Sequence, residues 1–234
     1  MDWNFFRYPL DEIPFVLLVL LIAFTLHEFA HAYTAYKFGD PTAKNLGRVT
    51  LNPRVHLDII GTLLILIAGF GWAKPVPVNR GKFKHPRLMG IVVSVAGPLA
   101  NLLIAFVGML ICYILFKFHL VEAMSTGVYE AVRLFMKLLI FLNLTLFLFN
   151  LLPLPPLDGY RIVEDILPLH LRLKFAKIEQ WAIYIFLLMV FIPPISRVTL
   201  GPVFALQMPI FAGIDALLSG IFGYRVDWVK FLLA

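Results

Sequence analysis

Apolar residues follow one another in long runs along this chain, and short polar stretches separate the runs. Three runs reach the ~20 residues that a helix needs to cross a bilayer; they extend from about Ile13 to Phe38, from about Leu88 to Phe116 and from about Ala131 to Leu152. Two later runs, Trp181 to Ile192 and about Val203 to Phe222, are shorter or contain proline, and each is either a tilted span or an interfacial helix. The pattern predicts an all-α polytopic membrane protein with about five to six transmembrane helices.

The run from Ile59 to Gly71 is apolar but short, and glycines interrupt it. As a helix it would extend only about 20 Å, against ~30 Å for the hydrocarbon core of a bilayer. The loops on both sides are basic, and a crossing would place one of them on the side that basic loops avoid. The sequence therefore predicts a re-entrant segment here, with a short tilted span as the alternative.

The composition excludes an ordinary soluble protein, because 61% of the 234 residues are hydrophobic and only 15% are charged. We expect one integral membrane domain over residues 1–234, with its core at about 13–170 and C-terminal helices at about 178–222. The N-terminal region lacks the positive n-region of a signal peptide, so the first apolar run is expected to stay in the protein. The single cysteine, Cys112, leaves no internal disulfide to form.

The net charge of +6 indicates orientation in a membrane rather than nucleic-acid binding, because Lys and Arg gather in a few loops. The loops at about 42–58, 74–87 and 153–180 are basic and are expected inside the cell. The loop at about 117–130 is not basic and is expected outside. This distribution predicts an N-terminus outside and, after five crossings, a C-terminus inside.

Candidate chemistry lies in the first apolar run, which holds His27, Glu28 and His31 in the spacing H-E-x-x-H. On a helix, residues four positions apart share one face. Two neutral imidazoles with this spacing can hold zinc, and the intervening glutamate can reach a water on the metal. A charged side chain at the centre of a bilayer costs roughly 2.5–3.5 kcal/mol, so three polar residues within two turns need a common purpose. A polar triplet in a helix–helix contact is the alternative without metal.

A third ligand is predicted after the third long run, where the chain reads N-L-L-P-L-P-P-L-D-G from Asn150. The prolines prevent a regular helix, and irregular backbone at membrane depth is tolerated where it is buried in protein or lines a cavity. Asp158 therefore falls near the depth of the two histidines, and a catalytic zinc commonly takes three protein ligands. Asp58, Glu164 and Asp165 are competing carboxylates, and Asp158 could instead cap the following helix.

Together these motifs resemble the site-2 protease family of intramembrane zinc metalloproteases. The resemblance rests on H-E-x-x-H in one membrane helix, on A-G-P-x-x-N from Ala96 in the next full span, and on N-x-x-P-x-P-x-x-D-G after the following one. Their order and spacing agree with the family over about residues 13–170.

The resemblance implies specific roles for the motif residues. Glu28 is the implied catalytic base, and Asn101 and Asn150 match positions that the family is thought to use for the substrate carbonyl or the framework of the site. Three side chains are implied to hold one Zn2+ per chain: His27, His31 and Asp158.

The family also favours a small membrane-associated β element beside the active site, and Gly47–Pro53 and Lys74–Asn79 are its candidates here. Many members carry a PDZ or CBS domain, for which this chain has no room. The implied activity is hydrolysis of peptide bonds within or near transmembrane helices of membrane-protein substrates. The enzyme would work in the lipid bilayer of the cell membrane, with its active site toward the cytoplasmic side and no nucleic-acid partner.

Two other classes of function compete with this interpretation. A non-catalytic zinc-binding assembly factor would have a closed site, usually with four protein ligands, and His56 is the nearby spare histidine. A metal transporter would carry polar ligands on several helices along a path, whereas here they gather at one depth. The sequence carries no signal for an oligomeric state.

Overall fold

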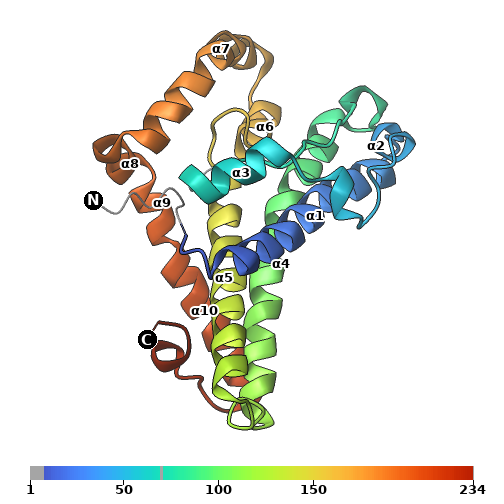
Figure 1. Cartoon of the computed structure of the whole chain (residues 1–234). Coiled ribbons are helices and arrows are strands. Elements are labelled where there is room, and N and C mark those ends of the chain that lie inside the picture. The colour runs from blue at the N-terminus through green and yellow to red at the C-terminus, as the bar shows by residue number, and fades with distance from the viewer. Residues whose placement is uncertain (1–7, 69–70, 234) are drawn as a thin grey trace.

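The computed structural model of the chain describes residues 8–68 and 71–233, and its regular elements are helices (Figure 1). Short turns of 3-10 or π type also occur: η1 (Pro53–Val55), η2 (Arg80–Lys82) and η3 (Val229–Leu233). The α-helices, in chain order, are α1 (Ile13–Lys37), α2 (Thr42–Asn45), α3 (Ile59–Ala68), α4 (Pro86–Lys117), α5 (Thr126–Asn150), α6 (Asp158–Ile166), α7 (Leu169–Phe191), α8 (Pro193–Thr199), α9 (Gly201–Ala205) and α10 (Gln207–Phe222).

Four helical stretches in the described chain are long and apolar enough to cross a bilayer: α1, α4, α5, and α9 together with α10. Helices suit this setting because a bilayer core offers no water to satisfy backbone N–H and C=O groups. The first stretch ends at Gly39, which takes a φ of 95°, a conformation that glycine adopts without steric cost. The prediction of an all-helical, multi-span membrane protein is confirmed, with fewer such stretches than the five to six expected.

The central helix is α4, which packs against α1, α5 and α6. In Figure 1, α5 runs beside α4 and α1 crosses both helices at an angle. Their shared core contains Leu20 of α1, Met109 of α4, and Ile140 and Leu144 of α5, all at most 2% exposed. This packing places His27 and His31 of α1 against α4.

The described residues before and after the run that contains α3 lie against each other. A Cβ on Gly61, in the first turn of α3, would lie 2.1 Å from the carbonyl oxygen of Trp72, so the two backbones touch. The N–H of Lys74 then donates to the carbonyl of His56 at 2.8 Å, which closes the base of the hairpin. Residues 69–70 of the predicted re-entrant run lie outside the described residues. The described residues therefore bring the two ends of this run together, while the re-entrant path itself stays a prediction.

The C-terminal part of the chain follows one broken path instead of two crossings. In Figure 1, α7 begins beside α6, and α8, α9 and α10 continue to the end where α4 joins α5. There Phe231 packs against Phe116 and Tyr129, with ring centroids 5.0 and 6.0 Å apart. The fifth crossing and the C-terminus at the opposite end are thus not confirmed, since the described helices offer four candidate spans. The cause is that Pro193–Pro194 bends the chain without reversing it, and that the first half of α7 is too polar to be a separate span.

The two segments expected to form a β element, Gly47–Pro53 and Lys74–Asn79, are irregular in the structure, which corrects that prediction. In the first, Gly47 has a φ of 68°, and the Asn52 side chain accepts the N–H of Arg54 at 3.1 Å to cap η1. In the second, two prolines lack the N–H that a β ladder needs. The backbone N–H groups of Lys74, Val76 and Asn79 donate instead to His56, Glu28 and Asp40.

A polar cluster fastens α10 and the C-terminal segment to α4. Asp215 of α10 accepts from the hydroxyl of Tyr113 at 2.5 Å and from the indole N–H of Trp228 at 2.6 Å. The hydroxyl of Tyr224 donates to the carbonyl of Tyr113. We call Tyr113, Asp215 and Trp228 the α10 cluster.

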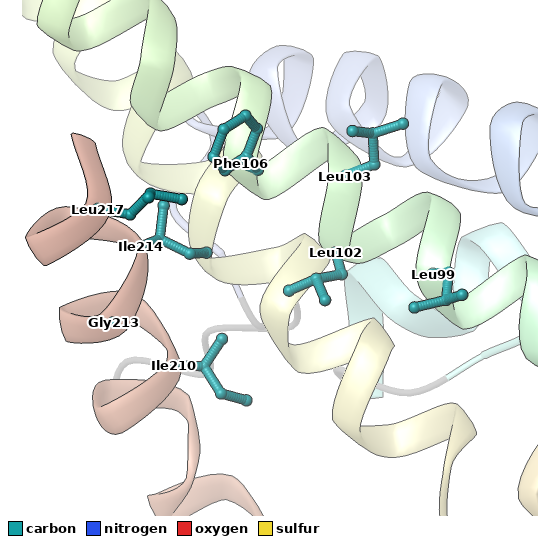
Figure 2. A pocket seen from close by; sticks show the side chains of 8 residues that line it. All are labelled: Leu99, Leu102, Leu103, Phe106, Ile210, Gly213, Ile214 and Leu217. Carbon is teal, nitrogen blue, oxygen red and sulfur yellow. The ribbon is translucent and has the colours of Figure 1, made fainter. Parts of the chain in front are cut away.

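Beside this cluster, α4 and α10 line an open apolar cavity of about 500 Å³. Figure 2 shows the side chains that line it, which are Leu99, Leu102, Leu103, Phe106, Ile210, Gly213, Ile214 and Leu217. None of these residues can titrate or act as a nucleophile. The wall of this cavity therefore offers no candidate catalytic side chain among the residues that line it.

Candidate metal centre

The structure brings together His27 and His31 of α1 and Asp158, the first residue of α6. The two Nε2 atoms lie 3.0 Å apart, and each lies 3.2 Å from Oδ2 of Asp158. Both histidines are only 7% exposed. The i, i+4 spacing on α1 places both rings on one face, as predicted, and the proline-rich loop after α5 delivers the aspartate to them. We call these three residues the metal centre.

The atoms that face one another at the metal centre are all electron-rich. Nδ1 of His31 lies 2.7 Å from the carbonyl of Val93, which can only accept, so this nitrogen carries the proton. Nδ1 of His27 lies 2.7 Å from Oδ1 of Asn101, which also only accepts. Both Nε2 atoms therefore direct lone pairs at Oδ2 of Asp158, a buried oxygen with no hydrogen-bond donor among the described residues. Three such atoms repel one another unless a cation lies between them, and nitrogen and carboxylate ligands of this kind suit zinc.

Two glycines make the close approach at the metal centre possible. A Cβ on Gly97 of α4 would lie 2.2 Å from Nε2 of His31 and 2.7 Å from Cε1 of His27. A Cβ on Gly159, next to Asp158, would lie 2.2 Å from the carbonyl oxygen of Leu151. The first glycine lets the imidazoles pack directly on α4, and the second lets α6 begin against the end of α5.

Glu28 lies on α1 between the two histidines and is 7% exposed. Its Oε2 accepts the backbone N–H of Val76 at 3.0 Å. The segment 74–79 is held on either side of that contact, because Arg48 donates to the carbonyl of Lys74 and Asp40 accepts the N–H of Asn79 at 2.6 Å. An irregular segment that no local pattern linked to the motif therefore covers the glutamate.

Two other residues considered as ligands are engaged elsewhere. Oδ1 of Asp58 accepts the N–H of Gly61 at 2.8 Å and caps the start of α3. Nε2 of His56 lies 2.8 Å from the carbonyl of Thr50 and donates to it. Among the described residues, neither side chain belongs to the group that could hold a metal.

The competing carboxylates Glu164 and Asp165 pair with arginines instead. Nη1 of Arg80 lies 3.1 Å from Oε2 of Glu164 and 2.9 Å from Oδ1 of Asp165. Burial raises the pKa of Glu164, but attraction to Arg80 and Arg172 outweighs this effect and leaves the pKa below its ordinary value. Burial raises the pKa of Asp165 above its ordinary value. These ion pairs tie η2 to α6, the helix that begins with Asp158.

The two asparagines singled out in the sequence lie in different places. The amide of Asn101 contacts His27 on one side and donates to Asn143 on the other. Asn150 donates to the carbonyl of Leu146 within its own helix at 2.9 Å. Sequence reasoning missed Asn143, which is 0% exposed. A buried asparagine in an apolar run was the available signal, because polar side chains inside a membrane are rare without a partner.

A membrane-embedded helical bundle with two histidines, an aspartate and an adjoining glutamate at one buried point defines a membrane metalloprotein. Residues 15–193 match the model of the family described as Peptidase family M50. The chain belongs to this family, and the resemblance to site-2 proteases is confirmed.

Named relatives support the same assignment. The chain is 51% identical over 201 residues to YwhC of Bacillus subtilis (strain 168), provisionally named a zinc metalloprotease, covering 85% of this chain and 90% of that protein. It is 30% identical over 197 residues to Rip2 of Mycolicibacterium smegmatis (strain ATCC 700084 / mc(2)155), which has the same provisional description, covering 81% and 72%. It is 34% identical over 182 residues to Rip2 of Mycobacterium tuberculosis (strain ATCC 25618 / H37Rv), covering 74% and 65%. No solved structure matches the chain. Zinc is the metal that these names give.

Proposed function

We propose that this protein is an intramembrane zinc metalloprotease that hydrolyses peptide bonds within or near transmembrane segments of membrane proteins. The observation that carries the proposal is the convergence of His27, His31 and Asp158 beside Glu28 at one buried point. Three protein ligands leave a coordination position for water, which is the arrangement of catalytic zinc sites.

Bound zinc supplies Lewis-acid activation of water and of the scissile carbonyl. Glu28 takes the proton from the attacking water and gives it to the leaving amine, as a general base and then a general acid. The N–H of Val76 holds one oxygen of Glu28 at 3.0 Å, which leaves the other oxygen to handle the proton. Asn150 is the better candidate to donate to the substrate carbonyl, because it is only partly buried and the bond of its NH2 group to Leu146 uses one of two hydrogens, whereas Asn101 is fully buried between His27 and Asn143.

The proposed substrate is a transmembrane helix that unwinds locally before cleavage. A cavity of about 770 Å³ lies between α1, α3, α5 and α7 to α9, and apolar residues such as Leu20, Ile65 and Leu142 form much of its wall. These walls suit an apolar segment arriving from the bilayer. Residues 74–79, beside Glu28, provide a stretch against which an unwound substrate could lie extended.

The proposed site faces the cytoplasmic side of the cell membrane. Basic residues that favour that side, including Lys82, Lys84 and Arg87, lie between η2 and the start of α4. The metal centre contacts Val93 and Gly97, within the first turns of the same helix. Reversal of this orientation in a protease-protection assay of membrane vesicles would contradict this part of the proposal.

The test combines metal content with cleavage. Purified wild type should contain about one zinc per chain, and His27→Ala and Asp158→Ala should lose it. Glu28→Gln should keep the metal and lose cleavage of a transmembrane reporter by at least ~100-fold, the lower end of what a general base contributes. Full activity of Glu28→Gln would contradict the mechanism, and wild type that is active without zinc would contradict the metal centre.

The assembly-factor alternative makes the opposite prediction. A structural zinc site usually has four protein ligands, whereas the group found among the described residues has three. If zinc is present and no membrane protein is cleaved by wild type, the non-catalytic alternative gains support.

A further inference from the structure

Two buried amides connect His27 to the backbone of α5. Oδ1 of Asn101 faces Nδ1 of His27 at 2.7 Å, and Nδ2 of Asn101 donates to Oδ1 of Asn143 at 2.9 Å. Nδ2 of Asn143 donates in turn to the carbonyl of Leu139 at 2.8 Å. Both asparagines are 0% exposed. We call this series of contacts the amide relay.

The far end of the amide relay fixes the direction of every hydrogen bond in it. A backbone carbonyl only accepts, so Asn143 must turn its NH2 group toward Leu139 and its oxygen toward Asn101. Asn101 must then donate with its own NH2 group, which leaves its oxygen facing His27. Because that oxygen only accepts, Nδ1 of His27 must carry the proton, and Nε2 keeps its lone pair.

We propose that Asn143 is a positioning residue of the metal centre, which acts through Asn101 to hold His27 in the tautomer whose Nε2 can bind zinc. The inference rests on the proposed role of His27 as a zinc ligand. Without Asn143, the amide of Asn101 is free to flip and to present its NH2 group to His27, which favours a proton on Nε2. His31 needs no relay, because the carbonyl of Val93 fixes its tautomer directly.

Zinc affinity measured by competition with a chelator tests this role in two variants with opposite expectations. Asn143→Leu keeps the volume but cannot accept from Asn101, so affinity should fall 10–100-fold, the usual effect of removing a group that orients a metal-binding histidine. Asn143→Asp can still accept from Asn101, so affinity should stay within about threefold of wild type, well above that range. A residue that only fills space inside an apolar bundle would show the reverse order, since leucine is then the milder change.

The matched control is Thr145→Val, two residues further along α5. Thr145 also donates to a backbone carbonyl one turn earlier, that of Phe141 at 2.8 Å, but it has no contact with the amide relay. This variant should bind zinc as wild type does. If Asn143→Leu does not fold, Asn143→Ala takes its place with the same expected loss.

The tautomer itself provides a second readout that needs neither zinc nor activity. Nitrogen-15 NMR of histidine-labelled, metal-free protein distinguishes a protonated Nδ1 from a protonated Nε2, and His27→Asn identifies the signal. Wild type and Asn143→Asp should show protonated Nδ1 at His27, and Asn143→Leu should show protonated Nε2 there.

These outcomes separate the amide relay from the proposed function. Unchanged zinc affinity and unchanged tautomer in Asn143→Leu, or equal losses in Asn143→Leu and Asn143→Asp, would overturn the role of Asn143. If wild type binds no zinc while Nδ1 of its His27 carries the proton, the proposed function is wrong. The role of the amide relay in fixing the tautomer would still be supported.

Discussion

The metal centre and the α10 cluster both place carboxylates against aromatic or imidazole groups among the membrane helices. In the α10 cluster, one oxygen of Asp215 receives two donors, the Tyr113 hydroxyl and the Trp228 indole N–H. In the metal centre, Oδ2 of Asp158 faces two imidazole nitrogens whose protons lie on the opposite side of each ring. The first carboxylate is satisfied by the protein, whereas the second needs a ligand.

This difference shows that a polar residue inside a membrane does not by itself identify a functional site. Asp215 stabilises the fold, because its partly buried carboxylate has hydrogen-bond donors and so carries little desolvation cost. The same hydrogen bonds hold Tyr113 and Trp228 to α10. Asp158 is the opposite case, because its Oδ2 faces two imidazole nitrogens and has no hydrogen-bond donor among the described residues, a cost that a bound cation would offset. The hydrogen-bond donors around each carboxylate distinguish Asp215 from Asp158, whereas the hydropathy of the sequence does not.

The largest expected effect comes from adding one carbon atom at the metal centre. In Gly97→Ala, the new Cβ would lie 2.2 Å from Nε2 of His31, which would displace the imidazole. Zinc affinity should fall at least ~100-fold, the upper end for loss of ligand orientation, and cleavage should fall with it. Gly213→Ala is the control, since a Cβ there meets nothing within 4 Å. Normal zinc content in Gly97→Ala would contradict the geometry.

The next effect comes from removing the acceptor in the α10 cluster. Asp215→Leu leaves the Tyr113 hydroxyl and the Trp228 N–H without their partner, which should lower the free energy of unfolding by about 1–3 kcal/mol. The zinc affinity of the folded protein should not change, because the cluster fastens α10 and not the metal ligands. Thermal unfolding in detergent, followed by zinc titration of the same sample, measures both. A loss of zinc affinity at unchanged stability would contradict the purely structural role of the α10 cluster.

An intermediate effect is expected at the ion pairs between η2 and α6. Arg80→Gln removes both contacts to α6, so the segment that covers Glu28 and the helix that carries Asp158 lose a tie. Cleavage should slow roughly tenfold, since small misplacement of catalytic groups is costly, while zinc stays bound. Arg161→Gln is the control, because Arg161 contacts Glu164 from a side chain that is 48% exposed. Equal effects of both variants would contradict the positioning role.

The smallest expected effect is a dependence of stability on pH. The pKa of Glu164 lies below its ordinary value, so its ion pairs stabilise the fold fully above the unfolded pKa of about 4.3. That contribution is lost as the pH falls through the folded value. Glu164→Gln should therefore lower stability by about 1 kcal/mol or less near neutral pH, and the difference from wild type should vanish in acid. Paired thermal unfolding curves from neutral to acid pH measure it, and a constant difference would contradict this account.

The sequence predicted those parts of the site that depend on local spacing. His27, Glu28 and His31 follow from helix periodicity alone, and Asp158 follows from a proline-rich loop at the right depth. The amide relay could not be predicted, because the contact between Asn101 and Asn143 depends on the register in which α4 packs against α5.

The fold was predictable to a similar degree. Long apolar runs predicted α1, α4 and α5, because a hydrophobic chain in a bilayer must satisfy its backbone hydrogen bonds internally and a helix does so. The path of α7 to α10 was not predictable, because apolar runs give no direction of travel and a pair of prolines can bend a chain or reverse it. The resemblance placed residues 74–79 beside the active site but as a β element, and their contacts with Glu28 and Asp40 could not be predicted because these partners lie far away in the sequence.

The order in which the metal ligands are translated gives the metal centre a consequence for biogenesis. His27 and His31 are made with the first helix, but Asp158 follows only after α4 and α5. A nascent chain still emerging from the ribosome therefore holds two ligands and cannot complete the three-ligand site. Under the proposed function, proteolytic competence would begin only when α6 docks on α4 and brings Asp158 to the two histidines.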